Sequence, residues 1–243
     1  MILELDIGNT RCKWRLAGAG APAGRDGACP VDALAAVLAA LPERGAIARV
    51  RAGCVRGPQV EAAVGAEVRG ALGLEAEFAR SRARAAGVRN AYAEPERLGV
   101  DRWLAMLAGF AEVGGAVCVL DCGSAITADL VDADGDHRGG YIVPGLAMMR
   151  ASLLAETDRV RFGAAVTGTG GAPGHNTAEA VGGGTLLAAA GFLAAARARF
   201  ARDCPGATVL LTGGDAQTIA ACVDFPLQLR PQLVLDGLCR ALP

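Results

Sequence analysis

The chain has 243 residues and a formal net charge of −1 at pH 7. Its 24 basic residues are 23 arginines and a single lysine, Lys13, and the arginines are scattered along the sequence. A nucleic-acid-binding face needs a clustered basic stripe, so the sequence predicts no nucleic-acid partner. The length suits two lobes of roughly 100–150 residues each.

Cysteine and histidine usage argues against disulfides and zinc. There are eight cysteines but no CxxC motif, and only two histidines, His137 and His175. Reduced, buried thiols in a cytoplasmic protein are the simplest interpretation. The longest apolar stretch, residues 182–196, is shorter than the ~20 residues that a membrane span requires. Because the first residues also lack the pattern of a signal peptide, we expect a cytoplasmic protein with no membrane association.

The first half of the chain begins with two extended runs. Residues 2–5 and 12–16 are expected to form a β-hairpin whose turn contains Gly8 and Asn9. The other elements predicted up to residue 113 are helices at 31–41, 58–72 and 99–113, a strand at 47–55, and a surface loop at 80–97.

The second half starts with strands again. Asn176, with Glu179 three residues later, is a capping-box signal for a helix that extends to about residue 202. The strands predicted here are 116–120, 125–132, 136–143 and 208–212, with turns at 121–124, 134–135 and 213–214. The other predicted elements are a helix ending at 154, a Gly-rich loop at 161–175, and helices at 215–222 and 232–241.

Two segments share one plan, ILELDIGNTRCKWRL near the start and VCVLDCGSAITADLV in the middle. Each has an aliphatic strand, an Asp-x-Gly-polar turn and a second strand, and the two acids are Asp6 and Asp121. Such a repeat indicates two similar lobes, 1–115 and 116–243, whose turns face a common cleft. Two unrelated hairpins are the alternative, because Asp and Gly are common in turns.

The two turns have the features of a phosphate cradle. Glycine lets the backbone approach a ligand, turn N–H groups can form an anion nest, and Asn9, Thr10, Ser124 and Thr127 add polar side chains. A carboxylate beside a phosphate is repulsive unless a cation lies between them, and Mg²⁺ is commonly held by one or two carboxylates and by phosphates. Lys13 would supply a compact charge for a terminal phosphate. A solvated lysine on an edge strand is the alternative.

Gly99-Val100-Asp101-Arg102, at the start of a predicted helix, is a second candidate site. Asp101 could accept a hydroxyl proton while Arg102 holds a carboxylate or phosphate. An N-terminal helix cap explains the same aspartate without chemistry, so the spacing leaves both interpretations open. A weaker candidate is Gly213-Gly214-Asp215, a turn on which an adenine ring could lie. The P-loop motif GxxxxGK[ST] does not occur.

Five stretches together resemble type III pantothenate kinase, a family of the acetate kinase, sugar kinase, heat-shock-70 and actin superfamily. They are DIGNT followed by Lys13, NAYAEPERLGVDRW, DCGSAITADLV, GGYIVPGL and GHNTAEAVGGG, and they span nearly the whole chain in the family's order. The phosphate-loop motifs alone would indicate only the superfamily. The resemblance implies an α/β, actin-like ATPase (ribonuclease H-like) fold, duplicated into two lobes with mixed sheets flanked by helices.

The resemblance also implies an activity. ATP would donate its γ-phosphate to pantothenate, giving 4′-phosphopantothenate in the first step of coenzyme A biosynthesis. The family uses Mg²⁺ and a monovalent cation, potassium or ammonium, and forms a homodimer with the substrate pocket near the interface. Asp101 would be the general base and Asp121 would hold the monovalent cation. The implied ATP-binding residues are Asp6, Ile7, Gly8, Asn9, Thr10, Arg11, Cys12, Lys13 and Ser124. The pantothenate pocket would be lined by Tyr92, Gly99, Val100, Asp101, Arg102 and Thr177, and Thr177 could act across the interface.

One departure from the family pattern is visible, since Ser124 stands where the family often has threonine; the hydroxyl is retained. Two alternatives stay open. One is another kinase of the superfamily, acting on a sugar or on acetate. The other is a non-catalytic regulatory relative, a transcription accessory factor, for which loss of the base or of the lysine would be the expected mark. Asp101 and Lys13 are both present.

Overall fold

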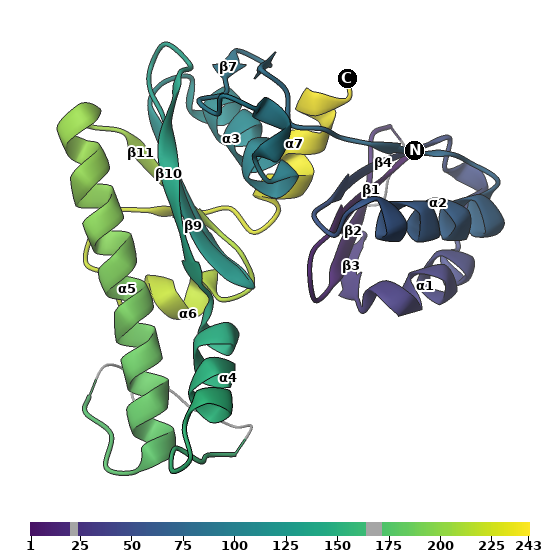
Figure 1. Ribbon diagram of the computed structural model, residues 1–243. Coiled ribbons are helices and arrows are strands. Elements are labelled where there is room, and N and C mark those ends of the chain that lie inside the picture. Colours follow the sequence, from purple (N-terminus) through teal and green to yellow (C-terminus); the bar gives the residue numbers. More distant parts are fainter. Residues whose placement is uncertain (20–23, 164–171) are drawn as a thin grey trace. The chain divides into compact units, whose positions relative to one another are not determined.

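The computed structural model describes residues 1–19, 24–163 and 172–243 (Figure 1). The chain divides into two compact units, the first made of Met1–Glu112 with Gln232–Pro243 and the second of Val113–Pro231. The sequence-based division assigned the last helix to the second lobe, whereas α7 (Leu233–Ala241) packs in the first unit against its sheet. The apolar side of α7, with four buried aliphatic residues, needs a core to cover it, and the first unit provides one.

The first unit contains a five-stranded sheet in the order β3-β2-β1-β4-β5. Its strands are β1 (Ile2–Ile7), β2 (Cys12–Ala17), β3 (Asp26–Cys29), β4 (Arg49–Cys54) and β5 (Ala76–Phe78). Pairs β1–β2 and β2–β3 are antiparallel, and pairs β1–β4 and β4–β5 are parallel. The predicted N-terminal hairpin is confirmed.

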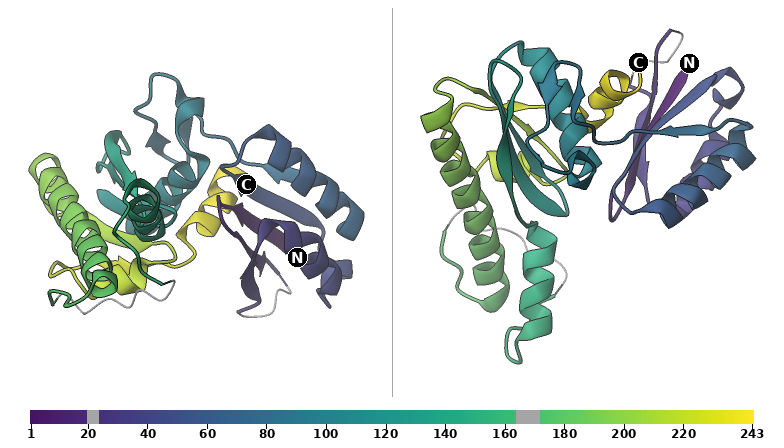
Figure 2. Two further views of the ribbon diagram at one scale, coloured as in Figure 1. Left: turned by 60° about the horizontal axis from the view of Figure 1, so that its bottom comes forward. Right: turned by 45° about the horizontal axis from the view of Figure 1, so that its top comes forward.

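Helices α1 (Leu34–Ala40) and α2 (Pro58–Leu72) cover one face of this sheet, as the two views of Figure 2 show. Side chains of a strand alternate between faces, so the fully buried Leu3, Leu5 and Ile7 point toward these helices. Glu4 and Asp6 therefore face the opposite side, where α7 contacts β1 and β4. One face of the sheet is thus apolar and the other carries charge.

The remaining parts of the first unit differ in detail from the sequence predictions. The helix predicted at 31–41 starts as a 3₁₀ turn, Val31–Ala33, before α1. The predicted surface loop contains a short hairpin, β6 (Arg84–Ala85) with β7 (Val88–Arg89), and a 3₁₀ turn at Pro95–Arg97; another 3₁₀ turn lies at Arg44–Ala46. Helix α3 (Val100–Val113) begins one residue after its predicted start.

The second unit repeats the architecture of the first. Its five-stranded sheet has the order β10-β9-β8-β11-β12, again with two antiparallel pairs followed by two parallel pairs. The strands are β8 (Val117–Cys122), β9 (Ala125–Val131), β10 (His137–Pro144), β11 (Thr208–Thr212) and β12 (Gln228–Leu229), and the helices are α4 (Leu146–Glu156), α5 (Thr177–Asp203) and α6 (Ala216–Ala220). The duplicated α/β architecture with mixed sheets is confirmed. Residues 164–171 of the predicted Gly-rich loop lie outside the described residues.

Helix α5 is the one helix in the described part of the chain that is long and apolar enough, by length and composition, to cross a membrane. Its cap is the predicted one, since Asn176 Oδ1 accepts a hydrogen bond from Glu179 N at 3.0 Å. Leu186, Leu193 and Phe200 are buried in the core that α5 forms with the second sheet. Core helices pass the same length and composition test, and these contacts pack one side of α5 against the core of its unit.

Candidate active site

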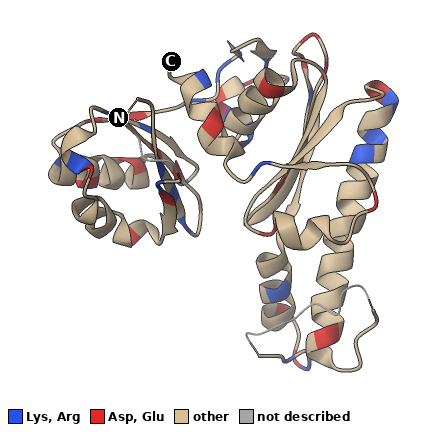
Figure 3. Cartoon of the chain, turned by 180° about the vertical axis from the view of Figure 1, so that it is seen from behind, with Lys and Arg blue, Asp and Glu red and all other residues tan. Residues whose placement is uncertain are grey.

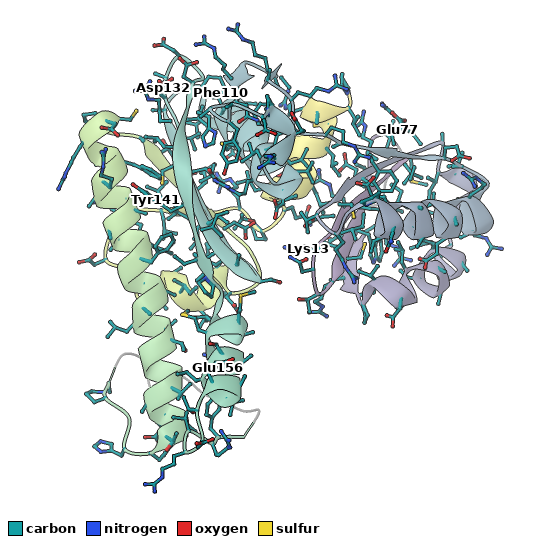
Figure 4. All side chains as sticks on the ribbon, viewed as in Figure 1. Lys13, Glu77, Phe110, Asp132, Tyr141 and Glu156 are labelled. Atoms are coloured by element: carbon teal, nitrogen blue, oxygen red, sulfur yellow. The ribbon has the colours of Figure 1, made fainter. Side chains whose placement is uncertain are left out.

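Asp6 and Lys13 stand directly opposite each other. Asp6 on β1 is in register with Lys13 on the antiparallel β2 and with Gly53 on the parallel β4. Side chains of directly opposed residues share one face of a sheet, so the acid and the lysine both lie on the face away from α1 and α2. Figure 4 labels Lys13 on β2.

Both acids of the repeat lie in strands, which corrects the prediction that they belong to the turns. Asp6 is the fifth of six residues in β1, and Asp121 is the fifth of six in β8. The strands continue because the following residues, Ile7 and Cys122, are buried in the two cores. The matching positions mean that the two acids occupy equivalent places in the two sheets.

The turn after Asp6 is closed by its own backbone. Gly8 N donates to Arg11 O at 3.0 Å, and a Cβ at Gly8 would lie 3.2 Å from that oxygen. Asn9, Thr10 and Arg11 are exposed, whereas Ile7 and Cys12 are buried. Of the predicted ATP-binding residues in this segment, these last two can therefore offer a ligand only their backbone groups.

The pKa of Asp6 shows which groups surround it. Burial raises this pKa from 3.8 to about 6; the charge of Lys13 lowers it and the charge of Asp101 raises it. Asp101 is remote in sequence, yet its charge acts on Asp6, so the two carboxylates share one electrostatic environment in the first unit. A cation bound beside this carboxylate would lower the pKa of Asp6 again. Carboxylate oxygens are ligands that Mg²⁺ prefers, so this donor set fits a magnesium ion.

Asp101 is held by the first turn of α3. Its Oδ1 accepts a hydrogen bond from Arg102 N at 2.8 Å. A Cβ at residue 99 would lie only 2.7 Å from this oxygen, which explains the glycine of the GxDR segment. Asp101 is the second residue of α3 and satisfies one N–H group of its first turn, while its charge also acts on Asp6. Its role as a general base stays a prediction.

Tyr92 and Arg102 form a pair next to Asp101. Arg102 Nη1 donates to the Tyr92 hydroxyl at 3.0 Å, and the guanidinium lies 5.9 Å from the centre of the ring. Arg102 is buried, and its hydrogen bond to the Tyr92 hydroxyl holds the guanidinium in a fixed place. These two residues and Gly99-Val100 are therefore gathered at the start of α3. That they line a pantothenate pocket stays a prediction.

A cavity of about 420 Å³ lies beside this group in the first unit. It lies where β4 and β5 end and α2 and α3 begin, and its wall includes Gly99, Val100, Arg80 and Ser81. The carboxyl ends of parallel strands are the usual place for a ligand in α/β proteins. Sequence reasoning missed Arg80 and Ser81, because β5 is too short to be recognised.

Asp121 lies at the equivalent strand end of the second unit. It is in register with Thr127 on β9 and Thr212 on β11. Gly213 has φ +101°, and a Cβ there would lie 2.5 Å from Asp121 Oδ1 and would collide with the backbone of Cys122. Only glycine permits this approach, so the turn after β11 packs directly on Asp121.

The turns around Asp121 are tied to one another. Asp215 N donates to Cys122 O at 2.9 Å, and Gly145 N donates to Ser124 O at 3.0 Å. Burial raises the pKa of Asp215, and the charge of Arg150 lowers it. Asp121, Ser124 and the Gly-Gly-Asp turn, the weaker candidate in the sequence, are therefore gathered at one strand edge.

Thr177 is the first residue of α5 and is exposed. It lines an apolar cavity of about 1040 Å³ together with residues of α4, among them Met148 and Leu153. Thr177 belongs to the second unit and the Tyr92–Arg102 pair to the first, so their meeting in one pocket stays a prediction. The common cleft for Asp6 and Asp121 stays a prediction for the same reason.

The family model of type III pantothenate kinase matches residues 2–199. The chain belongs to the type III pantothenate kinase family. The type III pantothenate kinase of Ectopseudomonas mendocina is 42% identical to it over 255 residues, which cover 100% of this chain and 99% of that protein.

Two solved structures are similar to the chain in fold. A Campylobacter jejuni protein described as a Baf family transcriptional activator has a TM-score of 0.63 and 18% identity, over 99% of this chain and 96% of that one. A Sinorhizobium meliloti protein described as a 2-dehydro-3-deoxygalactonokinase has a TM-score of 0.53 and 13% identity, over 99% and 98% of the two chains. These likenesses concern the fold alone, and they confirm the predicted actin-like, sugar-kinase type of architecture.

Membership in the type III pantothenate kinase family implies an enzyme that uses ATP and a divalent metal. The two residues whose loss would mark a non-catalytic relative, Lys13 and Asp101, are present in this member of the family and lie near the same carboxylate, Asp6. The chain therefore does not show the loss of residues that would favour the regulatory alternative.

Proposed function

We propose that this chain is an active pantothenate kinase, which transfers the γ-phosphate of ATP to the terminal hydroxyl of pantothenate. The product would be 4′-phosphopantothenate, and the reaction would be the first step of coenzyme A biosynthesis in the cytoplasm. The observation that supports this most is the register of Asp6 directly opposite Lys13 at the end of β1, in the same unit as Asp101, whose charge acts on the Asp6 carboxylate. A candidate phosphate-binding strand end and a candidate base would then serve one reaction.

Phosphoryl transfer has a loose transition state, so its catalysis rests on positioning and on neutralising charge. In the proposed site, the backbone of the 8–11 turn and the Lys13 ammonium would bind the phosphates of ATP. Asp6 would hold Mg²⁺, which neutralises the phosphate oxygens when bound. Lys13 lies directly across from Asp6, so it is placed to balance both the carboxylate and a transferring phosphate.

Asp101 would orient the acceptor hydroxyl and take its proton late in the transfer. The hydrogen bond from Arg102 N fixes the orientation of the carboxylate, and the absence of a side chain at Gly99 leaves room on one side of it. Arg102, held by the Tyr92 hydroxyl, would bind the polar end of pantothenate. Thr177 of the partner subunit would complete this pocket.

Asp121 would hold a monovalent cation, potassium or ammonium, beside ATP. Its carboxylate is enclosed by the Gly213 turn and stands in register with two threonines, Thr127 and Thr212. Carboxylate, hydroxyl and backbone carbonyl oxygens are suitable ligands for a hard cation, so the donor set fits. Ser124 would contact ATP from the same strand end.

We propose a homodimer formed through the exposed apolar face of α4 and α5. Met148 on α4 and Leu187 on α5 are 51% and 70% exposed. Figure 3 shows the long middle of α5 without charged residues, between Glu179 and Arg197. An apolar surface of this kind calls for a partner, and a second copy would also place Thr177 at the interface.

An assay that couples ADP release to a readout, run with pantothenate and with or without potassium, tests the proposal. We expect turnover that requires pantothenate and increases with potassium or ammonium. Turnover with hexoses or acetate in place of pantothenate would identify a different kinase of the superfamily. Failure of the folded protein to consume ATP with any of these acceptors would favour the regulatory alternative.

A further inference from the structure

A row of buried charges crosses the sheet of the first unit next to Asp6. Glu4, two residues before Asp6 on the same face of β1, is 1% exposed. Its neighbours in register are both arginines, Arg15 on β2 and Arg51 on β4. Arg15 Nε lies 2.6 Å from Glu4 Oε2, and Arg51 Nη1 lies 3.6 Å from Glu4 Oε1. The proposed function uses none of these three residues.

Arg15 also reaches the C-terminal helix. Its Nη1 donates to Asp236 Oδ1 at 2.5 Å and to Gln232 Oε1 at 3.0 Å. One guanidinium thus links β1, through Glu4, to the first turn of α7. The Glu4 and Arg15 side chains are 1% and 17% exposed, so Arg15 is held in place at the buried end of the link, whereas the Asp236 side chain is 43% exposed. The hydrogen bonds from this fixed guanidinium to Asp236 and Gln232 hold the first turn of α7 in a defined place on the sheet.

Helix α7 in turn touches the helix that carries Asp101. A Cβ at Gly237 would collide with the backbone of Leu104, so α7 and α3 approach each other closely at this point. The side chain of Leu104 also fills the space beside Gly53, where a Cβ would lie 2.8 Å from its Cδ1. Gly53 is the register partner of Asp6, and Leu104 lies one helical turn after Asp101.

We propose that Arg15 and Asp236 are positioning residues for phosphoryl transfer. Their ion pair fixes α7 on the sheet, and the contact of Gly237 with Leu104 passes this position on to the first turn of α3. The pair thereby sets where Asp101 stands relative to Asp6 and Lys13. The inference rests on the proposed role of Asp101 as the base. Because reacting groups tolerate displacements of only about 1 Å, a small shift of α3 should reduce the rate strongly.

Two substitutions break the link, Asp236→Ala and Arg15→Met. For each we expect kcat for pantothenate phosphorylation to fall at least tenfold, while KM for ATP changes less than threefold. Asp236→Asn keeps an oxygen that accepts from Arg15 and should retain kcat within about threefold of the unmodified enzyme. This isosteric variant also keeps the test valid if either of the first two folds poorly.

A control separates positioning from general loss of stability. Val68→Ala opens a cavity in the apolar core on the other face of the sheet, away from α7. It should lower Tm as much as Asp236→Ala or more, yet keep kcat within about twofold when all variants are assayed well below their Tm. If Asp236→Ala keeps the kcat of the unmodified enzyme, or if Val68→Ala loses kcat in proportion to Tm, the pair is merely structural and the inference is overturned.

A double-mutant cycle tests the route through Asp101. If the pair acts by placing this carboxylate, Asp236→Ala should lower kcat less than twofold in an Asp101→Asn background. Additive losses would overturn the inference and leave the base assignment intact. Full activity of Asp101→Asn alone would instead remove the base, and the proposed mechanism would fail before the positioning pair is considered.

Discussion

The raised pKa of Asp6 predicts that this residue lowers the stability of the ligand-free protein. The carboxylate is partly buried on the charged face of the first sheet, with Asp101 adding to the negative potential there. Asp6→Asn keeps the shape of the side chain and removes the charge. We therefore expect the variant to be more stable than the unmodified protein above pH 7 and yet to lose kinase activity.

The magnitude follows from the shift of the pKa from 3.8 to about 6. Each pKa unit corresponds to about 1.4 kcal/mol, and solvent screening of a partly exposed group reduces the total to roughly 2 kcal/mol. Because the folded-state pKa is the higher one, the stability linked to protonated Asp6 is complete below pH 4 and is lost as the pH rises through 6. The gain from Asp6→Asn should thus be absent near pH 4 and fully developed by pH 7.

Tryptophan fluorescence gives a selective assay. The chain has two tryptophans, Trp14 and Trp103, and both are buried in the first unit. Urea unfolding followed by this signal between pH 4 and pH 8 therefore reports on the unit that contains Asp6. Asp26→Asn, an exposed acid on β3, is the control and should show no comparable gain. Equal stability of Asp6→Asn and the unmodified protein at pH 8 would refute the electrostatic reasoning.

Three further predictions concern other parts of the molecule. Gly213→Ala should lower the unfolding free energy by about 2–4 kcal/mol, measured by circular dichroism in urea, because φ is +101° and a Cβ would strike Cys122; an unchanged unfolding midpoint would contradict the close approach. Leu187→Glu should convert the proposed dimer to a monomer in analytical ultracentrifugation, since it places a charge on the apolar face; a dimer that survives would move the interface elsewhere. Tyr92→Phe removes the hydroxyl that accepts from Arg102 and should raise KM for pantothenate about tenfold; an unchanged KM would exclude the pair from the acceptor pocket.

Much of the fold could be predicted because local signals agreed with the tertiary structure. The N-terminal hairpin, the repeat of its plan in the second unit and the Asn176 cap are each encoded within a few residues. The strands that were missed have no such signal. β3 (Asp26–Cys29) has the sequence DGAC and β5 (Ala76–Phe78) has three residues, so only pairing with neighbouring strands defines them.

Motifs in the sequence identified the residues of the candidate site, but they did not show which of these residues contact one another. The positions of Asp6 and Asp101 could be singled out from the sequence, but their proximity depends on how α3 packs. The link from Arg15 to Asp236 joins residues at opposite ends of the chain, and no pattern predicts it. The same is true of α7, whose amphipathic spacing predicts a helix without indicating which unit covers it.

The central claim is that Asp101 takes the proton of the acceptor hydroxyl while ATP is held at Asp6 and Lys13. Mass-spectrometric quantification of 4′-phosphopantothenate formed from pantothenate and ATP, for the unmodified protein and for folded Asp101→Asn, measures it most directly. We predict steady product formation by the first and a rate at least ~100-fold lower for the second. Product formed by Asp101→Asn at the unmodified rate, or none formed by either, would contradict it.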